Sequence, residues 1–229
     1  MYQEEKKIKR QKKLAAITEE EKPFGLPEGW EWARIDELSL HSEAGWSPKC
    51  EATPRIKNSW GVLKVSAVTW GRYNPNENKA LPVNLNPKPE YEVMPGDFLI
   101  SRANTAQLVA RSVVVPDDSP ACLMMCDKII RFVFSSEVDV EFINRVNAST
   151  FCRDYYARMA GGTSSSMKNV SRTTIRDLTI PLPPLPEQHR IVTKVNELLT
   201  LCDTLKTRLQ QAQTTQVQLA DTLVEQAVA

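Results

Sequence analysis

Basic and amide side chains gather in two separated stretches of this sequence. Residues 45–79 contain six Lys or Arg and two Asp or Glu. Residues 145–176 contain six Lys or Arg and one acidic residue. In a chain whose net charge is only +1, such clustering is typical of a localised phosphate-binding face, although an ordinary solvated surface can show it too. Arginine and lysine pair with guanine, and asparagine with adenine. The two stretches therefore carry groups suited to contact nucleic acid.

Groups that would catalyse a reaction are harder to find. The Asn/Asp-Pro-Pro-aromatic signature of adenine methyltransferases and a G-x-G-x-x-G nucleotide loop are both missing. Asp117, Asp127 and Lys128 resemble parts of a metal nuclease, but the adjacent side chains of Asp127 and Lys128 are expected to point apart. Five scattered cysteines and two histidines give no zinc spacing. We therefore expect no catalytic residue, metal or bound cofactor.

The elements that position the polar residues predict a mostly β domain. Residues 26–29 and 95–97 are typical of turns. Apolar spacing predicts one helix over 138–159, which ends before the glycine- and serine-rich segment 161–166. Short apolar runs bounded by turn residues predict strands at 30–35, 62–68, 98–102, 108–115, 122–134 and 179–180.

The C-terminal segment has the clearest pattern. A proline cluster at 181–186 predicts a rigid joint, since proline is expected to continue neither a sheet nor a helix. Beyond it, apolar or small residues recur at alternating steps of four and three, with Gln216 as the single polar member. This pattern predicts a coiled-coil helix about 60 Å long. Its seam consists of Ile191, Val195, Leu198, Cys202, Leu205, Leu209, Ala212, Leu219 and Leu223.

The seam predicts a protein partner. Four basic and five acidic residues from Pro186 onward leave the helix nearly neutral, so another helix suits it better than DNA does. The alternative is a helix folded back on its own domain. A rival function is an adaptor that uses the coiled coil and never contacts DNA, and salt-dependent DNA binding would separate the two.

Three motifs resemble the target-recognition domain of type I restriction–modification specificity subunits. LPEGWEW at 26–32 resembles its start, and PGDFLISRAN at 95–104 resembles its internal turn and strand. PLPPLPEQ at 181–188, with Ile191 and Val192, resembles the transition into a long spacer helix. The motifs follow the family order and cover nearly the whole chain.

The expected fold is therefore α+β: a mostly β target-recognition domain with a few helices, followed by a long coiled-coil spacer helix. The expected parts are a charged segment at 1–22, the recognition domain at 23–180, and the proline joint with the spacer helix at 181–229. No signal peptide and no apolar run of about 18 residues is present, which favours a cytoplasmic protein without membrane contact.

The resemblance also implies partners. Specificity subunits usually carry two recognition domains, each contacting half of a bipartite site in double-stranded DNA, with antiparallel helices between them. The helices dock methyltransferase subunits, which bind S-adenosylmethionine and methylate adenine, and a motor-nuclease subunit joins for restriction. This sequence has one such domain. It is expected to be a half-subunit that forms a homodimer through its helix or pairs with a second recognition half, a fragment of a longer chain, or a truncated antagonist of the methyltransferase.

The candidate DNA contacts lie in the loop-rich stretch 47–79, at the strand end after the turn at 95–97, and around the serine-rich run. Trp60 and Trp70 are expected in the core instead. The predicted DNA-binding residues are Lys49, Arg55, Lys57, Asn58, Arg72, Asn74, Arg102, Asn104, Ser164, Lys168 and Asn169.

Overall fold

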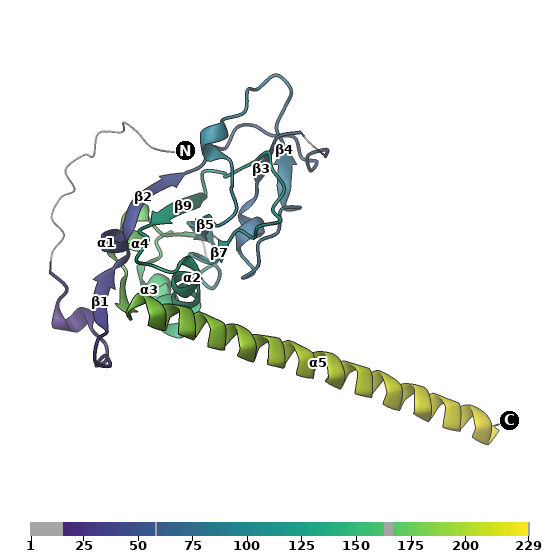
Figure 1. Ribbon diagram of the computed structural model, residues 1–229. Helices are drawn as coiled ribbons and strands as arrows, with labels where there is room; N and C mark the ends of the chain where they lie inside the picture. The colour runs from purple at the N-terminus through teal and green to yellow at the C-terminus, as the bar shows by residue number, and fades with distance from the viewer. Residues whose placement is uncertain (1–15, 58, 163–166, 229) are drawn as a thin grey trace.

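The computed structural model describes residues 16–57, 59–162 and 167–228 as a β domain from which one long helix projects (Figure 1). The strands are β1 (Glu31–Arg34), β2 (Ser39–Ala44), β3 (Gly61–Leu63), β4 (Asn78–Ala80), β5 (Phe98–Ser101), β6 (Ala103–Asn104), β7 (Ser112–Val114), β8 (Leu123–Met124), β9 (Ile129–Phe134), β10 (Lys168–Asn169) and β11 (Thr179–Leu182). The α-helices are α1 (Ile35–Leu38), α2 (Val140–Ala148), α3 (Thr150–Met159), α4 (Arg172–Asp177) and α5 (Leu185–Val228). Short 3-10 helices are η1 (Glu19–Glu21), η2 (Val65–Val68) and η3 (Pro89–Tyr91).

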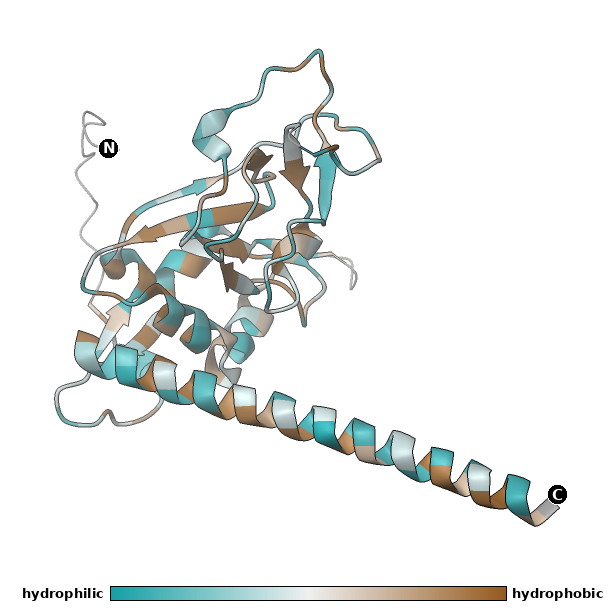
Figure 2. Ribbon diagram, turned by 45° about the vertical axis from the view of Figure 1, so that its right-hand side comes forward, coloured by the Kyte–Doolittle hydropathy of each residue, from teal (hydrophilic) through white to brown (hydrophobic). Residues whose placement is uncertain are grey.

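A four-stranded antiparallel sheet in the order β2-β9-β5-β7 forms the middle of the domain. Its side chains alternate between two hydrophobic cores, because successive residues of a strand point to opposite faces. Phe98 and Ile100 of β5 belong to the α2–α3 core, which those helices complete. Leu99 between them belongs to the β3–β8 core, shared with the small sheet β4-β3-β8. Figure 2 shows hydrophobic residues gathered in the middle of the domain, where β5 is buried on both faces and β7 and β9 are mostly buried, whereas the edge strand β2 is largely half-buried or exposed.

The predicted α+β fold is confirmed, with local corrections. The single strand expected at 62–68 is instead β3 followed by η2, and the run 122–134 divides into β8 and β9. The expectation that the proline cluster cannot continue a sheet is wrong, because β11 runs through Pro181 to Leu182 and pairs with β1. A strand bonded on one side only tolerates proline where the missing N–H would face away from its neighbour.

The single helix expected over 138–159 is two helices, because Ser149 interrupts it. Ser149 has extended backbone angles (φ −63°, ψ 154°) and is both the C-cap of α2 and the N-cap of α3. Its hydroxyl accepts a hydrogen bond from the N–H of Cys152, and Asp139 accepts from two N–H groups in the first turn of α2. Serine and aspartate suit these positions because their oxygens satisfy N–H groups that a helix start leaves free.

A buried hydrogen-bond network joins α2, α3 and β7. The hydroxyl of Tyr156, which has no exposed surface, donates to Asn147 Oδ1 at 3.0 Å. Asn147 Nδ2 in turn donates to the carbonyl of Ala110 at 2.9 Å and to Ser112 Oγ at 2.8 Å. Burial raises the pKa of Tyr156 well above its ordinary value, so the phenol stays protonated and remains a donor.

Replacing Tyr156 by phenylalanine is expected to lower the free energy of unfolding by about 1–3 kcal/mol, because Asn147 Oδ1 would be left buried without a donor. Urea unfolding followed by circular dichroism measures the change. Tyr155→Phe is the control, since its hydroxyl donates at 2.9 Å to the carbonyl of Thr174, a half-buried residue, and a smaller loss is expected. Equal losses in the two variants would contradict the role given to the buried network.

Helix α5 is fastened to the domain by its first turns and then leaves it (Figure 1). Gln188, only 1% exposed, donates through Nε2 to the carbonyl of Pro183 at 2.9 Å and accepts the N–H of Asp139 at 2.8 Å. Ile191, a seam residue, packs against the α2–α3 core. From 196 to 227 every residue is exposed, so most of the helix is not folded back on its own domain. In the described part of the chain, no helix has the length and hydropathy needed to cross a bilayer.

Candidate nucleic-acid interface

One edge of the central sheet gathers loops that carry several candidate DNA contacts. β2 and β5 end at this edge while β7 and β9 begin there, as the pairing of Ala44 with Ile130 shows for β2 and β9. Chain segments that meet at one edge of a sheet lie close together. We call residues 45–47, 102–105 and 126–128, together with strand β10, the loop edge.

Strands β6 and β10 bring four predicted residues together at the loop edge. Lys168 lies opposite Asn104 in this two-stranded ladder, and Asn169 lies opposite the residue before Asn104. Arg102 extends the ladder, because its carbonyl accepts the N–H of the residue after Asn169 at 2.9 Å. Two segments far apart in the sequence thus place an arginine, a lysine and two asparagines side by side.

The side chains of the ladder differ in how many partners they already have. Asn104 Nδ2 donates to Thr69 Oγ1 at 3.1 Å, and its Oδ1 accepts the next backbone N–H at 2.8 Å. Lys168 Nζ donates to the carbonyl of Gly162 at 2.6 Å. Arg102 has a buried Nε that finds no acceptor among the described residues. A buried donor without an acceptor is uncommon, so the environment of Arg102 is less satisfied than that of Asn104 or Lys168.

An exposed tryptophan stands beside the ladder. The bond from Asn104 to Thr69 ties the loop after η2 to β6, and the next residue, Trp70, is 71% exposed. The expectation that Trp70 lies in the core is wrong, because the chain turns at Gly71 (φ +74°) and leaves the ring in solvent. Trp60, by contrast, packs half-buried against the β3–β8 core, as expected. Sequence reasoning missed Trp70 as a candidate contact.

The remaining candidates occupy different environments. Arg72 has 86% of its side chain exposed, and its Nη2 lies 3.4 Å from Asp203 of α5. The Nη1 of Arg55 donates to three backbone carbonyls at 2.6 to 3.2 Å and so stabilises the loops around β3. Asn58 and Ser164 lie outside the described residues. The other exposed candidates in this part of the chain are Lys49, Lys57 and Asn74.

Asp127 and Lys128 form an ion pair instead of pointing apart, because they lie on a turn and not on a strand. Their Oδ2 and Nζ atoms are 3.1 Å apart. Although burial disfavours its charged form, hydrogen bonds from Ser47 and Lys128 hold the pKa of Asp127 below its ordinary value. Throughout residues 16–57, 59–162 and 167–228, no three His, Cys, Asp or Glu side chains gather as they would around a metal ion.

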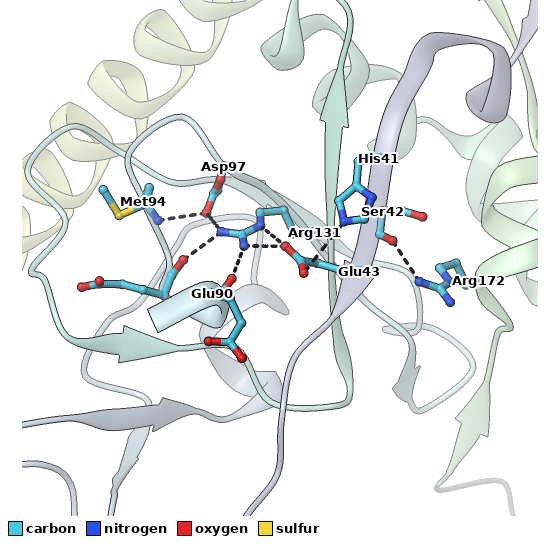
Figure 3. Close-up of polar contacts among 9 residues, drawn as sticks. His41, Ser42, Glu43, Glu90, Met94, Asp97, Arg131 and Arg172 are labelled. Atoms are coloured by element: carbon cyan, nitrogen blue, oxygen red, sulfur yellow. Dashed lines mark hydrogen bonds and ion pairs between the residues drawn. The ribbon is translucent and has the colours of Figure 1, made fainter. Parts of the chain in front are cut away.

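A partly buried arginine supports the sheet from its β3–β8 face (Figure 3). Arg131 of β9 donates to Glu43 at 2.6 Å, to Asp97 at 2.9 Å, and to the carbonyls of Glu90 and Glu92 at 2.7 and 2.8 Å. Burial opposes its charge, yet the two carboxylates raise the pKa of Arg131 above its ordinary value. Sequence reasoning missed this residue, although an arginine inside the apolar run IIRFVF was the available signal.

Residues 27–214 match the family model of the type I restriction modification DNA specificity domain, and the chain belongs to this family. It is 40% identical over 226 residues to the specificity subunit of the type I restriction enzyme EcoEI of Escherichia coli, covering 98% of this chain and 38% of that protein. It is 30% identical over 230 residues to the EcoAI specificity subunit, also of Escherichia coli, covering 98% and 37%. The chain thus spans less than two fifths of the length of these curated relatives.

Two solved structures share the fold. A chain from a structure of the type I R-M system matches with a TM-score of 0.56 and 20% identity, covering 80% of this chain and 42% of that one. The HsdS subunit from Thermoanaerobacter tengcongensis matches with a TM-score of 0.53 and 18% identity, covering 80% and 41%. The family resemblance inferred from the three sequence motifs is confirmed.

Proposed function

We propose that this chain is a sequence-reading part of a type I specificity subunit, which directs an adenine-N6 methyltransferase and restriction complex to a bipartite site in double-stranded DNA. Residues 23–180 serve as its target-recognition domain and residues 181–229 as its spacer helix. The observation that carries the proposal is the β6–β10 ladder, where basic and amide side chains lie beside the exposed ring of Trp70. Membership of the specificity-domain family supports it.

The candidate side chains divide between two kinds of DNA contact. Arg102 suits the N7 and O6 atoms of guanine, and Asn169 suits the N6 and N7 atoms of adenine. Lys49 and Lys57, both exposed, suit backbone phosphates, which supply affinity without sequence information. Catalysis is left to partner subunits: the methyltransferase binds S-adenosylmethionine, and the motor nuclease cuts DNA.

Helix α5 is the proposed partner-binding element. The exposed fractions of Leu198, Leu205, Leu209, Leu219 and Leu223 lie between 51% and 65%. Apolar residues that recur at coiled-coil spacing favour burial against another helix. The proposed occupants are a second copy of the chain or a second recognition half, together with methyltransferase subunits.

Methylation mapping tests this function. The chain is co-expressed with the methyltransferase subunit of the same system, and N6-methyladenine is mapped across a plasmid by long-read sequencing. A bipartite motif that is methylated only when this chain is present is the expected result. A palindromic motif would favour a homodimer with two identical half-sites, because both copies share one specificity. No methylation, despite a soluble complex of the two proteins, would contradict the proposal.

The exposed seam also favours a second candidate function. A protein that only binds partner helices, as an adaptor or as a truncated antagonist of the methyltransferase, would use α5 in the same way. Duplex binding separates the candidates, because an adaptor is expected to show no salt-dependent affinity for DNA. An antagonist would bind the methyltransferase and reduce methylation by the complete complex.

Replacing Trp70 by alanine is expected to weaken binding to cognate duplex about tenfold without changing the fold. The ring is mostly in solvent in the free chain, so its loss removes contacts that form only on DNA. Burying a large apolar side chain is worth about 1.5–3 kcal/mol. Fluorescence anisotropy measures the affinity. Met94→Ala is the control. It removes an apolar side chain that is 53% exposed and precedes the first residue of β5, at the end of this strand opposite the loop edge. Equal affinities for the Trp70→Ala and parent chains would remove Trp70 from the interface.

A further inference from the structure

A polar cavity of about 270 Å³ opens between β2 and α4, on the flank of the central sheet. β2 is an edge strand that pairs only with β9 in the described sheet, and α4 lies beside it. We call this feature the β2–α4 cavity. Its polar lining consists of Asp36, Ser39, His41, Ser42, Arg172 and Arg176.

The β2–α4 cavity has an excess of positive charge. Arg176 is paired with Asp36, so their charges cancel. Arg172 makes no ion pair with any residue in the described part of the chain, and one of its N–H groups donates to the carbonyl of Ser42 at 2.9 Å (Figure 3). A guanidinium has five N–H donors, so four remain for a ligand. His41 also lines the cavity, with its Nε2 3.9 Å from the carboxylate of Glu43, and the free N–H groups of Arg172 favour an anion.

The cavity lies within reach of the loop edge. Arg172 follows Asn169 by three residues, so their Cα atoms are at most about 11 Å apart. The phosphates that border a DNA groove about 12 Å wide lie at a comparable distance from the base edges inside it. A duplex that contacts the β6–β10 ladder with its bases therefore brings backbone phosphates close to Arg172. The planar fork of an arginine matches phosphate oxygens.

We propose that the β2–α4 cavity binds one phosphodiester group of the DNA backbone, with Arg172 as the main ligand and His41 as a further donor. This inference rests on the proposed function. A phosphate contact fixes the position of a duplex without distinguishing its bases. The cavity therefore sets the register of the β6–β10 ladder on DNA, and it acts equally on cognate and unrelated sequences.

The Arg172→Gln variant of the full chain tests the assignment by duplex binding at several salt concentrations. Loss of one phosphate contact is expected to reduce the slope of log Kobs against log [salt] by about one, with the same loss of affinity for cognate and unrelated duplexes. Arg172→Lys keeps the charge and is expected to retain most of the slope. Arg190→Gln is the control, because Arg190 is an exposed arginine of α5 paired with Glu187. Circular dichroism verifies the fold of each variant.

Duplexes with a single neutral methylphosphonate locate the contacted phosphate. At one position the modification is expected to weaken binding by the parent chain but not by Arg172→Gln. Two results would overturn the cavity assignment while leaving DNA binding by the parent intact. One is an unchanged salt slope in Arg172→Gln. The other is that, at every position, the methylphosphonate weakens binding by Arg172→Gln as much as it weakens binding by the parent chain. A parent chain without salt-dependent duplex binding would overturn the proposed function as well.

Discussion

Replacing Arg131 by alanine is expected to lower the free energy of unfolding by about 3–5 kcal/mol. The substitution leaves the carboxylates of Glu43 and Asp97, whose side chains are 24% and 15% exposed, without the cation that compensates them. Breaking this partly buried ion network is damaging because the remaining charges keep much of their desolvation penalty. For a chain of this size the melting temperature is expected to fall by roughly 10 °C. Guanidinium and thermal unfolding measure both quantities.

Two further variants separate the charge of Arg131 from its packing. Arg131→Met combined with Glu43→Gln is expected to be more stable than Arg131→Met alone, because one uncompensated carboxylate is removed. Arg158→Ala removes an exposed arginine from α3 and is expected to change stability by less than about 0.5 kcal/mol. If Arg131→Ala unfolds at the same denaturant concentration as Arg158→Ala, the network does not support the sheet.

Replacing both Leu205 and Leu209 by aspartate is expected to break the association of α5 with its partner helix. Two unpaired carboxylates in a helix interface cost several kcal/mol, which corresponds to a loss of affinity of about a thousandfold or more. The domain itself is expected to remain folded, because both leucines are more than half exposed in the isolated chain. Light scattering gives the mass of the assembly, and co-purification reports methyltransferase binding.

A matched pair on the other side of the helix controls for added charge. Thr207 and Gln211 each follow a seam leucine by two residues, which rotates them by about 200° around an α-helix. Thr207→Asp with Gln211→Asp is therefore expected to leave association intact. The seam assignment fails if the leucine variant keeps both its mass and its methyltransferase binding.

The sequence predicted the parts of the fold that depend on local signals. The turn at 95–97 forms, with Gly96 at a φ of +82° and the N–H of Asp97 bonded to the carbonyl of Met94, and β5 follows it. The long helix α5 was predicted from its repeat alone. The division of 138–159 at Ser149 was not, because a serine can lie inside a helix or cap one, and the choice depends on what the two helices pack against.

The candidate site was predictable by residue type and not by environment. Composition drew attention to Arg55 and Arg102 equally. The tertiary contacts differ, because Arg55 donates to three backbone carbonyls, whereas the Nε of Arg102 has no hydrogen-bond acceptor among the described residues. Trp70 was misplaced because a large apolar ring is usually buried, and only the path of the loop at Gly71 shows otherwise. The pairing of β6 with β10 joins distant segments, so no local pattern could reveal it.

The burial of strand β5 on both faces bears on how such a chain can diversify. Every side chain of β5 is buried, whereas positions such as Lys49 and Trp70 add little to either core. Lineages can therefore exchange residues in these loops through intermediates that all fold, and selection then acts on recognition. Gly45 is an exception, because a Cβ there would lie 2.1 Å from the carbonyl oxygen of Met125. Descendants with different targets are expected to share this glycine.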